Sequence, residues 1–273
     1  MMCFGWPGDR RTLPRLLLAL VLMTPSLVHA QAPSLVGDGT ITWGLAATFP
    51  PFEYIDDGKP VGFDIDLAGM LAKKLTLTST VTTFEFKGLI PALLGKRIDA
   101  IISGMYINAE RREVADFVPY LLVGNQIVVR NGNPAGLSDR MSLCGHRVSA
   151  PVGTVFEIAA SKVNADCEAA GKPKLSMLPL AGTTGSALAL SQDRADAIIV
   201  STPTAVSLIQ TAPGTYQTAG EPFDNETKVG IAVNKDNPLL AAALRKAMGE
   251  LVADGSYAQL LTRWKLPASS SAF

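Results

Sequence analysis

Short apolar runs alternate with amphipathic stretches along most of the chain. Apolar runs of strand length occur at residues 41–45, 81–86, 100–102, 126–130, 147–150, 175–178, 197–200 and 229–233. Between them, helical spacing of apolar residues predicts helices at 63–75, 88–95, 108–114, 154–170, 184–192, 202–210, 238–254 and 256–264. Repeated strand–helix alternation is typical of α/β layers built on mostly parallel sheets. The sequence therefore predicts an α/β fold.

Composition narrows the classes of protein further. The 273 residues include 24 basic and 24 acidic side chains, so the net charge argues against a nucleic-acid-binding surface. Hydrophobic residues make up 48% of the chain and charged residues 18%, which excludes a disordered polyelectrolyte. The length is sufficient for one large domain or for two domains of ordinary size.

The first 30 residues have the three-part order of a secretory signal. Arg10, Arg11 and Arg15 precede an apolar core at 16–23, and small residues follow. The core is too short to span a bilayer, which needs roughly 20 apolar residues. We expect residues 1–30 to be a signal peptide cut after Ala30, or alternatively after Ala32, and the mature protein to be exported to the periplasm. A buried N-terminal helix is the alternative.

Cysteine use agrees with export. Cys144 and Cys167 follow the signal, and two cysteines in an oxidising compartment most simply form a disulfide. The loop between them would contribute roughly 3 kcal/mol in the chain-entropy model. Two buried free thiols are the alternative. His146 is the only histidine after the signal, so the cysteines and this histidine leave zinc short of a structural ligand set. We expect neither a metal nor a cofactor.

A resemblance to a known family emerges from motifs in a fixed order. Gly-Phe-Asp-Ile-Asp-Leu at 62–67 resembles the signature of the periplasmic solute-binding proteins of family 3, which serve polar amino-acid ABC importers. Further matching motifs lie at 50–54, 89–100, 103–105, 110–112, 117–120, 153–154, 196–197 and 255–264. The resemblance therefore covers nearly the whole mature chain.

The resemblance implies a two-lobed periplasmic-binding-protein-like fold of type II, with mixed, mostly parallel sheets and two hinge strands. Lobe 1 would comprise residues 31–123 and 226–273, and lobe 2 residues 124–225. The hinges would lie near 121–126 and 223–228. Ligand would bind between the lobes, and hinge bending would close them around it.

Three residues would bind the ligand carboxylate. In the family, an arginine at the position of Arg111 forks onto this carboxylate, and a planar guanidinium matches a carboxylate with two parallel hydrogen bonds. Gly104 would offer its backbone N–H because the missing side chain allows close approach. Thr154 begins a predicted helix, where free N–H groups favour an anion. For Arg111, a surface position in the charged run 110–113 is the alternative.

Other positions of the family's site also have counterparts here. Phe49 and Phe86 match aromatic residues that pack on the ligand's aliphatic part. The remaining ligand-binding candidates are Ser103, Tyr106, Ser201 and Glu53. Asp64, at the start of a predicted helix, is interpreted as a cap or dipole partner.

The sequence departs from the family where the ligand's ammonium would bind. Many members have an acidic residue at the positions of Ser201 and Ala46. A buried ammonium without a charged partner is unfavourable by several kcal/mol. We therefore expect either a carboxylate ligand that is not a plain α-amino acid, or compensation by another acid. The candidates for that acid are Glu53, Glu157 and Asp224.

The function implied by the resemblance is the periplasmic substrate-binding component of an ABC importer. It would be a monomer that delivers an amino acid or related small carboxylate to a permease in the inner membrane. No nucleophile–base pair is evident, so we expect no catalytic residue. The alternative is an enzyme similar to the periplasmic cyclohexadienyl (arogenate/prephenate) dehydratases, in which Glu157 or Glu53 would protonate a leaving hydroxyl.

Overall fold

The computed structural model describes residues 1–5 and 33–273. The predicted signal peptide and both cleavage positions, Ala30 and Ala32, fall outside these residues, apart from the exposed first five. Ala32–Phe273 form one unit, which contains every helix and strand given below. Within the described ranges, every helix is too short or too polar to cross a membrane.

An eight-stranded mixed sheet organises this unit. In spatial order its strands are β5 (Thr78–Thr83), β1 (Thr40–Leu45), β6 (Ala100–Ile101), β11 (Tyr216–Asn234), β7 (Ala115–Arg130), β10 (Ala197–Ser201), β8 (Arg147–Pro151) and β9 (Ser176–Leu180). The pairs on either side of the centre are parallel, and the three pairs that involve β7 or β11 are antiparallel. The predicted α/β class with a mixed, mostly parallel sheet is confirmed.

Two long strands run through the centre of the sheet. β7 has 16 residues and β11 has 19, and they pair from Ala115–Asn234 at one end to Arg130–Tyr216 at the other. Their register shifts between Ala219 and Gly230. We call the side that carries β1, β5 and β6 the first half and the side that carries β8, β9 and β10 the second half.

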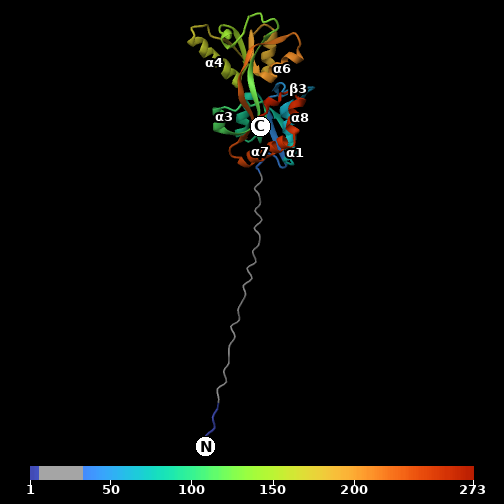
Figure 1. The fold of residues 1–273 in the computed structure, drawn as a ribbon, viewed down its shortest axis with the longest axis vertical. Coiled ribbons are helices and arrows are strands. Elements are labelled where there is room, and N and C mark those ends of the chain that lie inside the picture. The colour runs from blue at the N-terminus through green and yellow to red at the C-terminus, as the bar shows by residue number, and fades with distance from the viewer. Residues whose placement is uncertain (6–32) are drawn as a thin grey trace. The chain divides into compact units, whose positions relative to one another are not determined.

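Helices cover each half separately (Figure 1). The first half carries α1 (Phe63–Lys74), α2 (Leu89–Leu94), α3 (Ala109–Val114), α7 (Pro238–Ala253) and α8 (Ser256–Arg263). The second half carries α4 (Val155–Ala169), α5 (Thr183–Ser191) and α6 (Thr202–Thr211). A small sheet of β2 (Thr48–Phe49), β3 (Glu53–Asp56) and β4 (Lys59–Val61) extends the first half. Short 3₁₀ turns are η1 (Phe86–Gly88), η2 (Arg140–Leu143) and η3 (Ala268–Ser270).

Local sequence explains where the helices begin. The side chains of Asn108, Thr154, Ser201 and Asn237 each accept a hydrogen bond from a backbone N–H in the first turn of α3, α4, α6 and α7. These residue types are the preferred N-caps. The caps matter for function because two of the helices, α3 and α4, begin beside the candidate site described below.

Three predicted strands differ from the structure in their bounds. The strand expected at 81–86 is β5, which ends at Thr83, because Phe84 and Phe86 leave the sheet and pack against a separate apolar cluster around Leu89 and Ile101. The strands expected at 126–130 and 229–233 are only the ends of β7 and β11.

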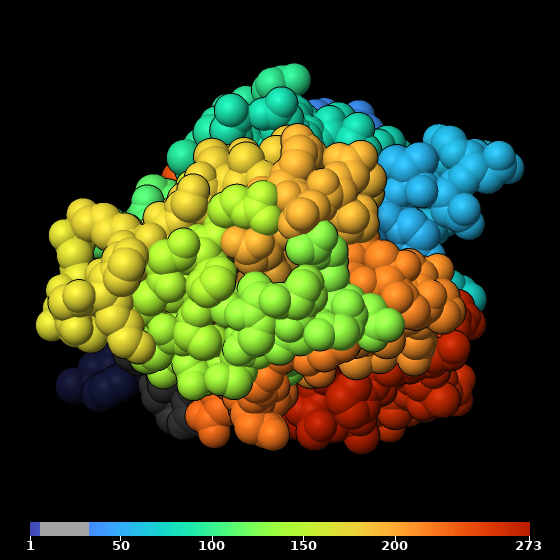
Figure 2. Space-filling model, turned by 90° about the horizontal axis from the view of Figure 1, so that it is seen from above, coloured from blue at the N-terminus to red at the C-terminus, as the bar shows by residue number. Residues whose placement is uncertain are grey.

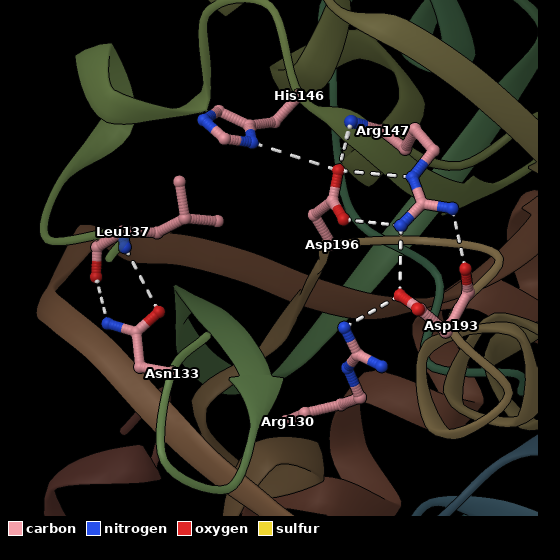
Figure 3. A network of polar contacts seen from close by, with 7 residues as sticks. All are labelled: Arg130, Asn133, Leu137, His146, Arg147, Asp193 and Asp196. Atoms are coloured by element: carbon pink, nitrogen blue, oxygen red, sulfur yellow. Dashed lines mark hydrogen bonds and ion pairs between the residues drawn. The ribbon is translucent and has the colours of Figure 1, made fainter. Parts of the chain in front are cut away.

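Covalent and ionic contacts tie the second half together. Cys144 and Cys167 form the predicted disulfide, with an S–S distance of 2.03 Å, which joins the end of η2 to α4. At the start of β8, Arg147 pairs with Asp196 at 2.6 Å and with Asp193 at 2.9 Å, and Arg130 also pairs with Asp193 at 2.7 Å (Figure 3). This network joins β7, β8 and the start of β10.

Candidate functional site

A small cavity lies between the two halves, and both halves line it. The first half contributes Ala46, Thr48, Phe49, Glu53, Phe86, Gly104, Tyr106 and Arg111, and the second half contributes Pro151, Thr154, Val155, Phe156, Ala181, Gly182 and Thr183. Its volume is about 20 Å³, which is room for about one water molecule. The halves are therefore closed on each other in this conformation.

Arg111 reaches across the boundary between the halves. It stands in the first turns of α3, where the Asn108 side chain accepts its backbone N–H at 2.8 Å. Its Nη1 donates to the Tyr106 carbonyl at 2.7 Å, and its Nη2 donates to the Gly153 carbonyl of the second half at 3.0 Å. The guanidinium carbon lies 5.4 Å from the centre of the Phe86 ring. Burial lowers the pKa of Arg111, but an arginine stays charged throughout the physiological range. The half-buried position on the cavity wall contradicts the alternative of a plain surface arginine.

Gly104 has a different role from the one expected. Its φ is +49°, and a Cβ there would lie 2.6 Å from the Phe49 ring, so a side chain would clash as well as strain the backbone. Its N–H donates to Asp64 Oδ2 at 2.6 Å. This N–H therefore has a partner in this conformation, and the expectation that it binds the ligand carboxylate stays a prediction.

Asp64 does not cap α1, although it lies in the first turn of that helix, as the alternative of a dipole partner requires. Gly62 precedes α1 without a side-chain cap, and the fully buried Asp64 carboxylate instead accepts the Gly104 N–H and the Tyr120 hydroxyl, the latter at 2.8 Å. Burial raises the pKa of Asp64 to about 6. This carboxylate therefore fixes the loop that carries Gly104 against α1 and β7.

Glu53 is the acidic residue that faces the cavity. It is completely buried, its Oε1 accepts the Ser103 hydroxyl at 2.6 Å, and its Oε2 accepts no N–H or O–H of the described residues. Its carboxyl lies close enough to that of Asp64 for the two groups to share a proton. Burial, and then the nearby Asp64 charge, raise the pKa of Glu53 well above its ordinary value. Ser103 does not line the cavity. Its hydroxyl donates to Glu53 and accepts the Ala46 N–H at 3.0 Å, so it holds the Glu53 carboxylate in place.

Aromatic rings close the cavity from both sides. The Phe156 ring of the second half packs edge-on against Phe49 at 5.6 Å and against Tyr106 at 5.4 Å between ring centres. The buried Tyr106 hydroxyl has no partner in the part of the chain that the structure describes. Sequence reasoning missed Phe156. Its place two residues after the Thr154 cap, on the first turn of a helix expected at the site, was the available signal.

The remaining candidates divide into residues on the cavity and residues away from it. Thr154 lines the cavity and caps α4, and its hydroxyl donates to the Pro151 carbonyl at 2.6 Å. Ser201 does not line it. Its hydroxyl is used at the start of α6, where it donates to the Thr204 hydroxyl at 2.8 Å.

The two other candidate acids also have their own local roles. Glu157 accepts the Gly153 N–H at 2.8 Å, and Asp224 lies 3.5 Å from the Asn125 amide. Neither acid lines the cavity. Across residues 1–5 and 33–273, no three His, Cys, Asp or Glu side chains are grouped so as to hold a metal ion.

Comparison with known proteins finds similarity to bacterial solute-binding proteins. Residues 41–267 match the family model described as bacterial extracellular solute-binding proteins, family 3. The L-cystine-binding protein TcyJ of Escherichia coli strain K12 is 30% identical over 230 residues, which cover 83% of this chain and 82% of that protein.

Solved structures agree with the sequence comparison. An ancestral arginine-binding protein bound to arginine superposes with a TM-score of 0.77 at 35% identity, covering 83% of this chain and 98% of that one. The ancestral amino acid-binding protein AncCDT-1, a precursor of cyclohexadienyl dehydratase, superposes with a TM-score of 0.73 at 28% identity, covering 83% and 95%. The family match spans most of the chain, and the chain belongs to the bacterial extracellular solute-binding proteins of family 3.

Proposed function

We propose that this protein is the periplasmic substrate-binding component of an ABC importer. It binds an amino acid or a related small carboxylate between its two halves and delivers it to a permease in the inner membrane. The observation that carries the proposal is the Arg111 guanidinium on the cavity wall, with its two terminal nitrogens directed to carbonyls of opposite halves. A carboxylate can replace both neutral carbonyls with a bidentate, charge-assisted pair.

We propose a division into two lobes, which the arrangement of the sheet supports. We assign residues 31–123 and 226–273 to lobe 1 and residues 124–225 to lobe 2, joined where β7 and β11 cross the boundary. Register shifts between Ala219 and Gly230 interrupt the ladder beside the expected hinges at 121–126 and 223–228. A two-stranded connection loses the fewest hydrogen bonds when it bends where its pairing is already interrupted. Hinges absorb the change in backbone dihedral angles in a few residues.

Glu53 provides the acid that Ser201 and Ala46 lack. Among residues 1–5 and 33–273 no N–H or O–H donates to its buried Oε2, which lies beside the cavity about 3.7 Å from the position a Gly104 Cβ would take. An ammonium or guanidinium there would gain a charged partner and satisfy that oxygen. The ligand would then carry both a carboxylate and a cation. The names of the relatives, which bind cystine and arginine, are consistent with an amino-acid ligand.

Binding requires the lobes to separate. A cavity of about 20 Å³ cannot admit an amino acid, and the Phe156 ring fills the space between Phe49 and Tyr106. Opening at the hinges would withdraw Phe156 and Gly153 together with the second lobe and free Arg111. The structure of residues 33–273 therefore corresponds to a closed form with its ligand space occupied by side chains.

Calorimetry of the ligand-free protein against the twenty L-amino acids and a set of amine-free organic acids tests this function. We expect one or a few amino acids to bind, Arg111→Lys to weaken binding about 100-fold, and Arg112→Lys, the exposed neighbour, to leave it unchanged. Glu53→Gln should weaken binding of amino acids and spare amine-free acids, whereas Glu157→Gln should affect neither. Tight binding that survives Arg111→Ala contradicts the proposal.

A second candidate function is a cyclohexadienyl dehydratase-like enzyme. One observation favours it: a buried carboxyl with a raised pKa faces the cavity, as a general acid requires, and AncCDT-1 has a similar fold. Incubation with prephenate and arogenate, followed by chromatography for phenylpyruvate and phenylalanine, separates the two functions. Turnover abolished by Glu53→Gln would favour the enzyme, and binding without turnover favours the transport role.

A further inference from the structure

A second and much larger cavity lies between the halves and shares no lining residue with the first. Its volume is about 840 Å³, within the range of about 300–1,000 Å³ typical of small-molecule sites. One wall is α6 of the second half, and the other is formed by Pro50, Pro51, Tyr54 and the C-terminal segment 263–270 of the first half. In Figure 2 the orange surface of the α6 region borders the red C-terminal segment, with the blue β3–β4 hairpin beside them.

The lining of this cavity is mostly apolar and contains two cationic side chains. Apolar and aromatic contributors include Pro50, Pro203, Val206, Pro222, Trp264 and Leu266. Val206 is 44% exposed although it is fully apolar, so its side chain is open to a ligand. Among the described residues that line it, the charged ones are Arg263 and Lys265, and none carries a carboxylate. Such a surface favours a molecule with an apolar body and one negative charge over a cation of the same shape.

Lys265 stands at a position where the backbone favours glycine. Its φ is +55°, and the N–H groups of Lys265 and Leu266 turn back to the carbonyls of Thr262 and Leu261 at the end of α8. Helices that end in this way usually have glycine there, because it adopts the left-handed region without strain. Arg263 already pairs with Asp66 at 3.2 Å, whereas Lys265 has no ion pair within the described part of the chain. Its exposed ammonium is therefore available to an anion in the cavity.

We propose that this cavity is a second ligand site, which takes a free amphiphilic organic anion with its apolar body along α6 and its charge at Lys265. A concave space bounded by both halves suits a dissolved small molecule better than a membrane surface, which needs an exposed convex or flat face. The proposal does not depend on what binds at Arg111, because the two cavities have separate linings.

Trp264 provides a reporter, since it lines the cavity, whereas Trp43 is fully buried and donates to Ser79. The probe is decanoate, titrated below its micelle concentration into the exported protein, with tryptophan emission and calorimetry as readouts. Decyltrimethylammonium is the matched cation of equal apolar length. We expect saturable binding of decanoate at concentrations at least tenfold lower than those the cation requires. Equal affinity for the two, or no saturation, overturns the proposal.

Substitutions in the lining of the second cavity test whether decanoate binds there. Lys265→Gly should weaken decanoate binding at least fivefold while the melting temperature stays equal or rises, because glycine relieves the strained backbone. Val206→Asp, an exposed substitution on the opposite wall, should also weaken it. Lys246→Gln, at an exposed lysine of α7 outside the lining, should change nothing. Unchanged binding in Lys265→Gly overturns the assignment, as does binding only to phosphatidylglycerol vesicles and not to free decanoate. Lys265→Gly lies outside the lining of the first cavity and should leave amino-acid binding there intact, which separates this result from the test of the first cavity.

Discussion

Gly182 of the second half lies against Thr48 of the first half so closely that a Cβ on Gly182 would be 2.6 Å from the Thr48 Cβ. The φ of Gly182 is −170°, which any residue can adopt, so only the approach of the two halves requires glycine here. The proposed opening of the halves would break this contact. The contact therefore offers a way to perturb closure without touching Arg111 or Glu53.

Gly182→Ala should shift the protein toward an open form and weaken ligand binding about tenfold or more, since the methyl group meets Thr48 before closure is complete. The melting temperature of the ligand-free protein should change little. Small-angle scattering and calorimetry measure the two effects. Gly185→Ala, whose new Cβ would make only an ordinary 3.8 Å contact with Leu180, is the control. Equal behaviour of the two variants would contradict the role of the Thr48 contact.

Arg111 should hold the ligand-free protein closed as well as bind ligand. Its Nη2 bond to the Gly153 carbonyl is a charge-assisted contact between the halves, of a kind that contributes about 1.5–3 kcal/mol. Arg111→Gln should therefore expand the ligand-free molecule in scattering experiments, and Arg112→Gln should not. A compact Arg111→Gln protein would show that apolar packing alone closes the halves.

The sequence predicted those site residues whose side-chain type and motif mark them, and it did not predict features that depend on contacts between distant segments. Arg111, Thr154, Phe49, Phe86, Tyr106 and Glu53 lie on the cavity as their motifs suggest. The capture of the Gly104 N–H by Asp64 could not be foreseen, because it depends on a loop and a helix 40 positions apart meeting with the right orientation. Phe156 was missed because an apolar residue at the start of a helix has no chemistry that marks it.

For the fold, too, the sequence predicted the locally marked elements better than those set by tertiary contacts. Apolar runs identified the parallel strands β1, β6, β8 and β10, since these are largely buried, whereas the edge strand β5 is mostly exposed. The long central strands were found only at their ends, because residues 115–125 and 216–228 mix polar side chains, proline and glycine with apolar ones. Their extended form is set by pairing with each other across the sheet, which is a tertiary contact and not a local preference.

Phe156 should contribute less to global stability than an aromatic residue of similar burial within one half. Its contacts with Phe49 and Tyr106 cross the boundary and can be lost by opening, whereas Phe52 is fully buried inside the first half. Phe52→Ala should lower the free energy of unfolding by about 3–5 kcal/mol. Phe156→Ala should lower it by roughly half as much or less, and should also widen the cavity. Urea unfolding measures both, and an equal loss would place Phe156 in the permanent core.

Asp196 should contribute to the stability of the second half. Its carboxylate accepts the Arg147 backbone N–H at 2.9 Å and pairs with the Arg147 guanidinium, which holds the pKa of Asp196 below its ordinary value. We expect Asp196→Asn to lower stability by about 1–2 kcal/mol. Asp254→Asn breaks the more exposed pair with Lys74 and should have an effect under about 1 kcal/mol. Thermal melts at neutral pH compare them, and a larger loss in Asp254→Asn would contradict this ranking.

The buried pair of Glu53 and Asp64 should make stability fall as pH rises. Both pKa values are raised in the folded protein, that of Asp64 to about 6, so the folded state keeps protons that the unfolded chain has already released. Unfolding free energy should therefore decrease from about pH 4 through pH 6, where Asp64 titrates, and further as pH rises through the raised pKa of Glu53, on the order of 1.4 kcal/mol per unit of pKa shift. Glu53→Gln removes one of these carboxyls and should flatten the curve of stability against pH, whereas Glu157→Gln should not.

A ligand cation beside Glu53 Oε2 would lower the pKa of Glu53, so ligand binding near pH 6.5 should release protons. Calorimetry in buffers of different ionisation enthalpy measures that release, and a binding enthalpy independent of the buffer would contradict the placement of the cation.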